Sequence, residues 1–190
     1  QHRVATRLGE TRTDLINIML QTLPGVAVTY QGEELGLRNT YLTWEQTVDP
    51  SACNTNDPVN YEASSRDGCR TPFPWAGDLK NGGFSENDNP WLPINPDYVD
   101  GYNVKSQEAA ENSHLKIFKR LTKLRKQNVL RQGTYQSKLT NSENVIVYLR
   151  KHESNWAVVI LNFGANAETV NVKAAFPGET TLPNTLPVYT

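Results

Sequence analysis

The stretch PGVAVTYQGEELG, residues 24–36, decides the fold class of this chain. It begins with a short run, Val26–Tyr30, that is almost continuously apolar and rich in β-branched residues, as is typical of a strand buried on both faces. Residues 11–23 before it carry apolar side chains at helical spacing, and the Pro-Gly pair ends that helix. A helix, a tight link and a buried strand in succession predict an α/β fold with a parallel sheet.

The other regular elements are expected in the second half of the chain. Residues 106–127 predict a helix, with Ser106 as its cap, acidic residues in its first turns and Lys and Arg in its last. From residue 129 onward the apolar period changes to two, which predicts a small antiparallel β-sandwich domain. The expected strands are residues 133–138, 145–150, 156–163 and 168–172. We therefore divide the chain into domains at residues 1–128 and 129–190.

Residues 31–104 form a long strand-to-helix loop with little periodicity. The loop is rich in Asn, Asp, Pro and Gly, yet aromatic residues occur along its whole length, unlike in a disordered segment. Ordered loops of this length are usually functional. Aromatic rings among Asn, Asp and Arg suit sugar binding, because the rings stack on C–H groups and the polar groups bond hydroxyls. The composition is equally consistent with a loop packed by its own rings.

The charge balance argues against several partners. With 19 Lys and Arg against 20 Asp and Glu, the chain offers no electrostatic basis for binding nucleic acid or an anionic membrane. No apolar run reaches the roughly 20 residues that span a bilayer, so no membrane segment is expected in this chain. The opening Gln1-His2-Arg3 lacks an initiator Met and a leader-like segment, which suits a fragment or a processed product.

Two carboxylates follow the expected strand. Glycosidic cleavage usually needs two carboxylates about 5 to 9 Å apart. Glu33 and Glu34 lie at the strand end where parallel barrels place their sites, but neighbouring residues on extended backbone point to opposite sides. We therefore predict a structural role, in which one carboxylate bonds backbone or Arg groups beneath a pocket.

A second polar cluster consists of Arg66, Asp67 and Arg70. An Arg in a loop presents a planar fork of donors that braces a carboxylate or holds adjacent sugar hydroxyls. An ion pair of Asp67 with Arg66 or Arg70, which would only shape the loop, is equally compatible with the sequence.

Cys53 and Cys69 flank a polar loop of about 15 residues, and a disulfide between them would contribute roughly 3 kcal/mol. We expect this bridge if the protein is secreted; two free thiols are the alternative. The cysteines have no neighbouring His for a zinc site, and the chain has no phosphate-binding loop or G-x-S-x-G motif. No metal and no organic cofactor are predicted.

Three motifs resemble α-glucosidases of the α-amylase family, most closely the insect maltase type. The segment SRDGCRTPFPW, residues 65–75, resembles the loop whose second Arg contacts the glucose at the non-reducing end, with Pro74 in place of the usual Gln. The opening QHRVATR resembles the continuation of the Asn-His-Asp motif that closes the seventh barrel strand. The last-strand motif is matched at Gly25, Tyr30, Gly32 and Glu34, with Ala27 where many members have Pro.

The resemblance implies that residues 1–128 are the last helices and strand of a (β/α)8 barrel. Arg70 and Gln1 would then be substrate-binding residues. Tyr30, Glu34, Arg66 and Asp67 would be structural residues near the site. The family's three catalytic carboxylates would precede Gln1, so the chain alone is expected to be inactive without the N-terminal part of the same barrel.

The resemblance also implies the activity of a retaining α-glucosidase, which releases terminal α-linked glucose from maltose-type oligosaccharides or sucrose without a cofactor. Such an enzyme is expected outside the cell, secreted or membrane-anchored. The alternative is the catalytically inactive, glucosidase-like ectodomain of an amino-acid transporter heavy chain. A third interpretation is a carbohydrate-binding β module with a helical stalk.

Overall fold

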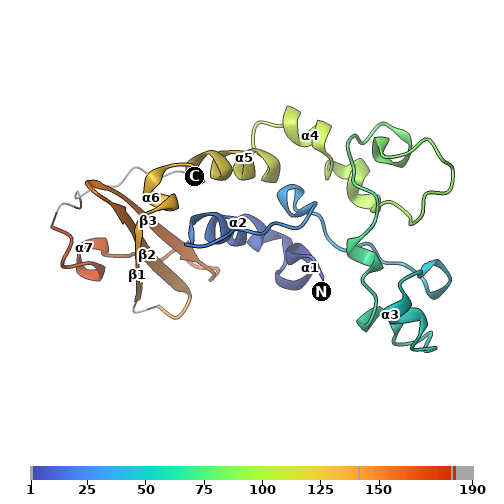
Figure 1. Cartoon of the computed structure of the whole chain (residues 1–190), viewed down its shortest axis with the longest axis horizontal. Helices are drawn as coiled ribbons and strands as arrows, with labels where there is room; N and C mark the ends of the chain where they lie inside the picture. The colour runs from blue at the N-terminus through green and yellow to red at the C-terminus, as the bar shows by residue number, and fades with distance from the viewer. Residues whose placement is uncertain (1, 141, 181, 183–190) are drawn as a thin grey trace. The chain divides into compact units, whose positions relative to one another are not determined.

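The computed structural model of the chain describes residues 2–140, 142–180 and 182. These residues form two compact units (Figure 1): unit 1 is built from residues up to 21 and from 26–123, and unit 2 from 22–25 and from residue 124 onward. The helices and strands are α1 (Val4–Leu8), α2 (Thr13–Thr22), α3 (Pro50–Cys53), α4 (Val104–Ala109), α5 (His114–Arg125), α6 (Asn128–Arg131), β1 (Thr134–Leu139), β2 (Val145–His152), β3 (Asn155–Asn162) and α7 (Val172–Ala175). Judged by length and hydropathy, none of the helices that the structure describes could cross a bilayer.

The helix expected at residues 106–127 is divided into α4 and α5. Asn103 rather than Ser106 caps α4, because its Oδ1 accepts the Ser106 N–H at 2.8 Å. Ser113 lies at the start of α5, where its Oγ accepts the Lys116 N–H at 3.2 Å. Asn and Ser side chains favour such caps over helix interiors, which explains the break between the two helices.

Residues 31–104 contain α3 and a series of short 3-10 turns rather than long elements. The turns are Glu33–Leu35, Trp44–Gln46, Tyr61–Ala63, Asp67–Cys69, Lys80–Gly83 and Pro96–Asp100. Leu35, Leu37 and Leu115 form a buried cluster at which the start of this segment meets α5. The aromatic side chains Phe73 and Tyr102 pack against that cluster, so part of the aromatic content serves packing.

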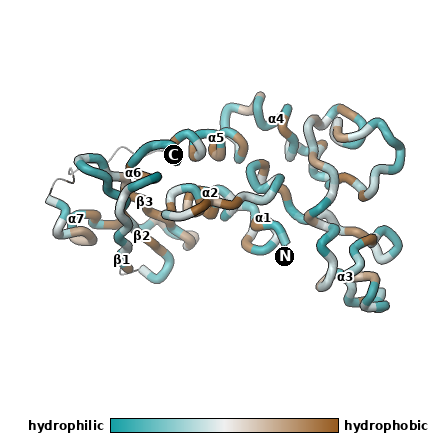
Figure 2. Tube along the Cα trace, in the orientation of Figure 1, coloured by the Kyte–Doolittle hydropathy of each residue, from teal (hydrophilic) through white to brown (hydrophobic). Residues whose placement is uncertain are grey.

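The strand expected at Val26–Tyr30 is not formed among the described residues. The segment is extended but pairs with no other strand, and Val26 and Val28 are 90% and 76% exposed. Its hydrophobic character can be followed along the trace after α2 in Figure 2. A parallel strand requires a neighbour on at least one side to bond its backbone, and none of the described segments supplies one.

The strands of unit 2 form one antiparallel sheet in the order β1-β2-β3. The three strands predicted at residues 133–138, 145–150 and 156–163 are thereby confirmed, with small shifts at their ends. The central strand β2 is buried on both faces: Val147 and Leu149 pack with Phe176 and Leu182 on one face. The alternate residues Tyr148 and Arg150 occupy the other face, toward α6 and residues 22–25.

Two details of the predicted β domain are wrong or unconfirmed. The strand expected at residues 168–172 is absent; α7 begins there because the Asn171 side chain accepts the Ala174 N–H and caps a helical turn. A second sheet, which a sandwich requires, is not seen among the described residues.

Arg150 is the largest fully buried side chain of unit 2. Its guanidinium donates to the carbonyl oxygens of Thr22 (2.8 Å), Leu130 (2.8 Å), Gly133 (2.9 Å) and Thr134 (3.1 Å). Burial lowers the pKa of Arg150. This side chain therefore joins the loop after α2, the end of α6 and the start of β1 through backbone acceptors alone.

Candidate functional site

Three segments of unit 1 that are distant in sequence converge on a cavity of about 320 Å³. The segments are residues 2–7, 30–33 and 66–70. Four guanidinium groups and one carboxylate line the cavity, so its charge and donors suit an oxygen-rich ligand. The lining residues are His2, Arg3, Arg7, Tyr30, Glu33, Arg66, Cys69 and Arg70.

Arg3 connects the three segments. It is 3% exposed, its Nη2 donates to the Cys69 carbonyl at 2.8 Å, and its Nη1 donates to the Gln31 carbonyl. Its guanidinium also lies 5.3 Å from the centre of the Tyr30 ring, within cation–π range. Burial lowers the pKa of Arg3, and the two carbonyls and the ring stabilise its charge.

Gly32 makes room for Arg3. Its φ of +89° is a conformation that side chains disfavour, and a Cβ there would lie 2.5 Å from Arg3 Nη1 and 2.6 Å from Leu37 Cδ1. A glycine is therefore favoured at position 32 both by the backbone conformation and by the close approach of Arg3.

Glu33 and Glu34 bond the backbone. The Glu33 carboxylate accepts the Tyr30 N–H at 3.2 Å, and the Glu34 carboxylate accepts the Gly32 N–H at 2.7 Å. Both contacts close the turn that follows the extended segment. In this arrangement the two side chains do not form an acid and nucleophile pair.

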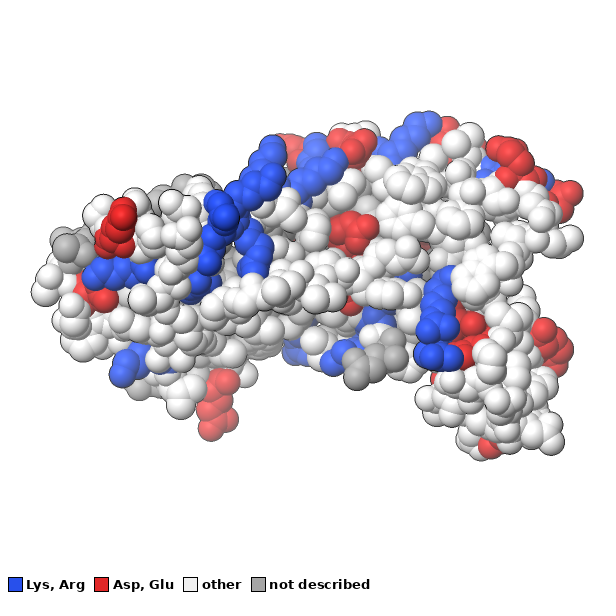
Figure 3. Space-filling view, in the orientation of Figure 1, with Lys and Arg blue, Asp and Glu red and all other residues white. Residues whose placement is uncertain are grey.

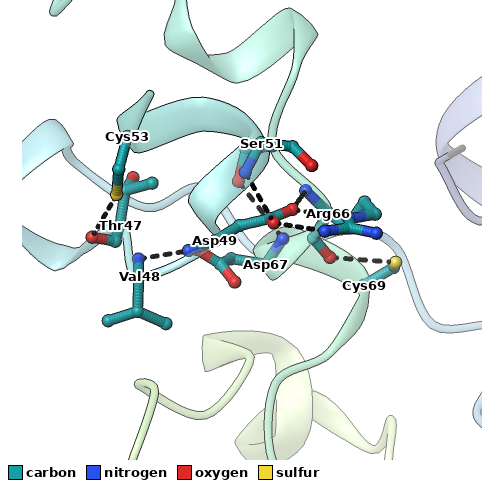
Figure 4. Close-up of polar contacts among 9 residues, drawn as sticks. Thr47, Val48, Asp49, Ser51, Cys53, Arg66, Asp67 and Cys69 are labelled. Atoms are coloured by element: carbon teal, nitrogen blue, oxygen red, sulfur yellow. Dashed lines mark hydrogen bonds and ion pairs between the residues drawn. The ribbon is translucent and has the colours of Figure 1, made fainter. Parts of the chain in front are cut away.

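Asp49 and Arg66 form a two-point ion pair beside the cavity (Figure 4). Arg66 Nε and Nη2 donate to the Asp49 carboxylate at 2.8 and 2.5 Å, and the Arg66 and Ser51 backbone amides donate to it as well. The hydrogen bond from Arg66 is the main cause that lowers the pKa of Asp49 well below its usual range. Arg66 is thus oriented at the cavity wall.

Asp67 does not pair with Arg66 or Arg70, in contrast to one of the two interpretations of the sequence. It is 1% exposed, and its carboxylate accepts the backbone amides of Val48 and Asp49, both at 2.8 Å (Figure 4). Arg66 binds the carboxylate of Asp49, whereas the carboxylate of Asp67 binds the backbone at residues 48 and 49 and so helps to position Asp49.

The disulfide expected between Cys53 and Cys69 is absent, and both thiols are free. Cys53 Sγ contacts the Thr47 carbonyl at 3.6 Å, whereas Cys69 Sγ contacts the Arg66 carbonyl at 3.1 Å. Figure 4 shows the two sulfur atoms on opposite sides of the Asp49–Arg66 pair. Each sulfur atom thus contacts a different backbone carbonyl rather than the other sulfur.

The structure places the other expected site residues as follows. Arg70 and Tyr30 both line the cavity, and burial, with a contribution from Cys69, raises the pKa of Tyr30. Glu34 bonds the Gly32 amide, next in sequence to Glu33, which lines the cavity. Gln1, also expected to bind substrate, lies outside the described residues.

Asp49 and Asn39 are site residues that the sequence analysis missed. Asp49 stands 17 residues before Arg66, and only its position before Pro50, typical of a helix N-cap, could have drawn attention to it. Asn39 bonds His2, Arg3 and Thr6, and no local sequence pattern indicates these contacts.

The surface carries two further features. A cavity of about 560 Å³ is lined by residues that include Asp14, Tyr102, Gln107 and His114, but by none of the motif residues. Lys and Arg also gather over α5 and α6 (Figure 3), where residues 112–142 contain no Asp or Glu. We interpret the basic surface as a solvated helix face. Among the described residues, no three His, Cys, Asp or Glu side chains converge as metal ligands would.

Comparisons with known proteins agree on one family. The family model of the alpha-amylase catalytic domain matches residues 1–133. Maltase A1 of Drosophila melanogaster is 46% identical over 170 residues, and the salivary alpha-glucosidase of Aedes aegypti is 46% identical over 176. These matches cover 90% and 92% of this chain, but only 29% and 30% of the relatives. The chain thus spans less than a third of their length.

Two more distant matches complete the comparison. The human amino acid transporter heavy chain SLC3A1 is 33% identical over 165 residues, which cover 85% of this chain and 22% of that protein. The crystal structure of trehalose-6-phosphate hydrolase from Bacillus licheniformis superposes with a TM-score of 0.75 at 27% identity, covering 86% of this chain and 32% of that one.

Proposed function

The chain belongs to the alpha-amylase family, and we propose that it forms the C-terminal part of a retaining α-glucosidase. In this proposal residues 1–128 supply the last helices and the eighth strand segment of a (β/α)8 barrel, and residues 129–190 the β domain that follows. The substrate is the terminal α-linked glucose of maltose-type oligosaccharides or of sucrose. The observation that carries the proposal is the placement of Arg70 and Tyr30, two residues of the family's motifs, on one cavity.

The geometry supports a binding role rather than the bond-breaking role for this part of the protein. A retaining glycosidase needs two carboxyl groups about 5 Å apart that flank the scissile bond. Glu33, the one carboxylate that lines the cavity, bonds the Tyr30 amide, and Asp49 and Asp67 bond Arg66 and backbone amides. We therefore place the nucleophile and the acid/base in the remainder of the barrel.

Arg70 is assigned the contact with the glucose at the non-reducing end. Its fork of N–H donors can hold two adjacent hydroxyl oxygens, which a single ammonium group cannot. Arg66, held by Asp49, supports the same wall of the cavity.

The exposed segment at residues 26–30 supports the assignment to a barrel. Val26 and Val28 would become buried if neighbouring barrel strands paired with this segment, and each buried Val side chain contributes about 1.5–3 kcal/mol. The 190-residue polypeptide alone is therefore expected to release no glucose from maltose.

The proposal is tested in the longer protein that contains this chain. Arg70→Ala should lower kcat/KM for maltose at least 100-fold, and Arg70→Lys should not restore it, because the two-point contact is lost. Arg120→Ala, an exposed change on α5, is the matched control and should have the parent's activity. Full activity of Arg70→Ala, or glucose release by the 190 residues alone, would contradict the proposal.

We place the protein outside the cell, in line with the salivary alpha-glucosidases that it resembles. Because Cys53 and Cys69 are both free, no disulfide between them supports an extracellular location. The transporter-partner alternative is supported less well, since identity to the transporter heavy chain is lower than to the insect glucosidases.

A further inference from the structure

Asn39 has an orientation that its neighbours determine. Its Oδ1 lies 2.9 Å from the backbone nitrogen of Arg3, which can only donate. The oxygen and nitrogen of the amide are therefore assigned without ambiguity, and the NH2 group points to His2. The Asn39 backbone N–H also bonds the Thr6 hydroxyl at 2.6 Å, so that the residue is held from both its backbone and its side chain.

This orientation selects one form of the His2 ring. Asn39 Nδ2 lies 2.6 Å from His2 Nδ1, and because the amide nitrogen donates, His2 Nδ1 must accept. A neutral imidazole that accepts at Nδ1 carries its proton on Nε2. Among the described residues, Nε2 has no hydrogen-bond partner of its own.

The ring lies on the same cavity as Arg70 and Tyr30. Since Nδ1 and Nε2 are separated by Cε1 and project from the ring in diverging directions, the Nε2–H points away from Asn39. A half-buried N–H donor without a hydrogen-bond acceptor among the described residues, on a cavity that four guanidinium groups and the Glu33 carboxylate also line, matches a ligand rich in oxygen acceptors.

We propose that His2 is a substrate-binding residue whose Nε2–H donates to a hydroxyl oxygen of the bound α-glucoside, and that Asn39 is the positioning residue that fixes the Nε2–H tautomer. The inference rests on the proposed glucosidase function of the cavity. It adds a neutral donor of defined direction to the charged donors of Arg70 and Arg66.

The tautomer of His2 is tested first, by a measurement that does not depend on catalytic activity. Long-range ¹H–¹⁵N correlation spectra of the ¹⁵N-labelled longer protein distinguish protonated from unprotonated ring nitrogens, and the signals that disappear in His2→Gln are assigned to His2. The expected result is an unprotonated Nδ1 and a protonated Nε2, with the Nε2 resonance shifting on addition of maltose. A protonated Nδ1, or an Nε2 resonance that saturating maltose leaves unchanged, overturns the proposal.

The contribution to catalysis is measured in the longer protein. His2→Phe removes the donor and should lower kcat/KM for maltose about 3- to 10-fold, mainly through KM, as expected for one neutral hydrogen bond. His2→Gln keeps an N–H donor and should recover part of the loss. His152→Gln, in the unit 2 hairpin, is the matched control and should have parental kinetics.

Asn39 is tested through its coupling to His2. Asn39→Leu should lower kcat/KM in the parent, and the Asn39→Leu, His2→Phe double variant should lose less than the product of the two single effects. Independent effects, or equal activity of His2→Gln and His2→Phe, overturn the proposal. A protein that hydrolyses no α-glucoside, yet whose His2 Nε2 signal responds to maltose, would refute the proposed catalysis and support the binding role of His2.

Discussion

Replacing Arg150 by Met tests whether unit 2 depends on a buried cation that has backbone partners only. Arg150 is 1% exposed, and its guanidinium supplies four hydrogen bonds to main-chain carbonyls. Met replaces the aliphatic part of the side chain, ends near the position of Arg Nε and has no donor. The substitution therefore removes the hydrogen bonds and leaves the space of the guanidinium group unfilled.

The magnitude follows from which carbonyls remain buried. The bonds to Thr22 and Leu130 are fully buried, and an unpaired buried acceptor costs about 1–3 kcal/mol. The bonds to Gly133 and Thr134 are only partly buried, so water can replace the donor there. Removing a buried charge recovers part of the loss. We expect a net destabilisation of about 2–4 kcal/mol.

Hydrogen exchange of the β2 amides measures this directly, because local opening reports the stability of the unit. At 1.4 kcal/mol per factor of ten, protection should fall about 30- to 1,000-fold in Arg150→Met. Arg131→Met, an exposed change at the end of α6, is the control and should change protection less than about threefold. Unchanged β2 protection in Arg150→Met, or an equal fall in the control, would refute the reasoning.

Two further predictions concern unit 1. Gly32→Ala should lower the free energy of unfolding by about 1–3 kcal/mol more than Gly101→Ala. Both glycines have positive φ, but of the two only Gly32 has neighbours, Arg3 among them, with which a Cβ would clash. Equal urea midpoints of the two variants would contradict this prediction. The hydrogen bond to Asp14 at 2.8 Å raises the pKa of His114. The stabilisation of the fold by this pair is therefore fully present below about pH 6.5, the usual pKa of His, and is lost as the pH rises through the raised pKa. Asp14→Asn should flatten the pH dependence of the urea midpoint, and a profile identical to the parent's would show that the pair does not contribute.

The fold was predictable from the sequence where a periodic segment pairs with strands that are its neighbours along the chain. The alternation of Val145–His152 gives one strand whose partners lie within a few residues along the chain, and the hairpin follows from it. Val26–Tyr30 has an equally clear strand pattern, but a parallel strand depends on distant segments, which a local pattern cannot supply. A helical turn replaces the expected last strand because the Asn171 side chain accepts a hydrogen bond from the Ala174 N–H.

The candidate site was predictable only at the residues that carry family motifs. Arg70 and Tyr30 were identified from such motifs, and both line the cavity. The partner of Arg66 was missed because Asp49 follows no periodic relation to it. Sequence proximity suggested Asp67 instead, yet that carboxylate faces backbone amides.

The two units share one structural feature that the local sequence pattern does not indicate. Arg3 in unit 1 and Arg150 in unit 2 are both nearly fully buried, and both donate to main-chain carbonyls of separate segments. An irregular segment has carbonyls that no helix or strand satisfies, and the five N–H donors of a guanidinium can bind several of them at once. A search for acid–base pairs therefore does not identify the hydrogen-bond partners of such arginines. Among the described residues, the hydrogen-bond acceptors of the Arg3 side chain are the backbone carbonyls of Gln31 and Cys69 rather than a carboxylate, and through them Arg3 joins the segments that line the cavity.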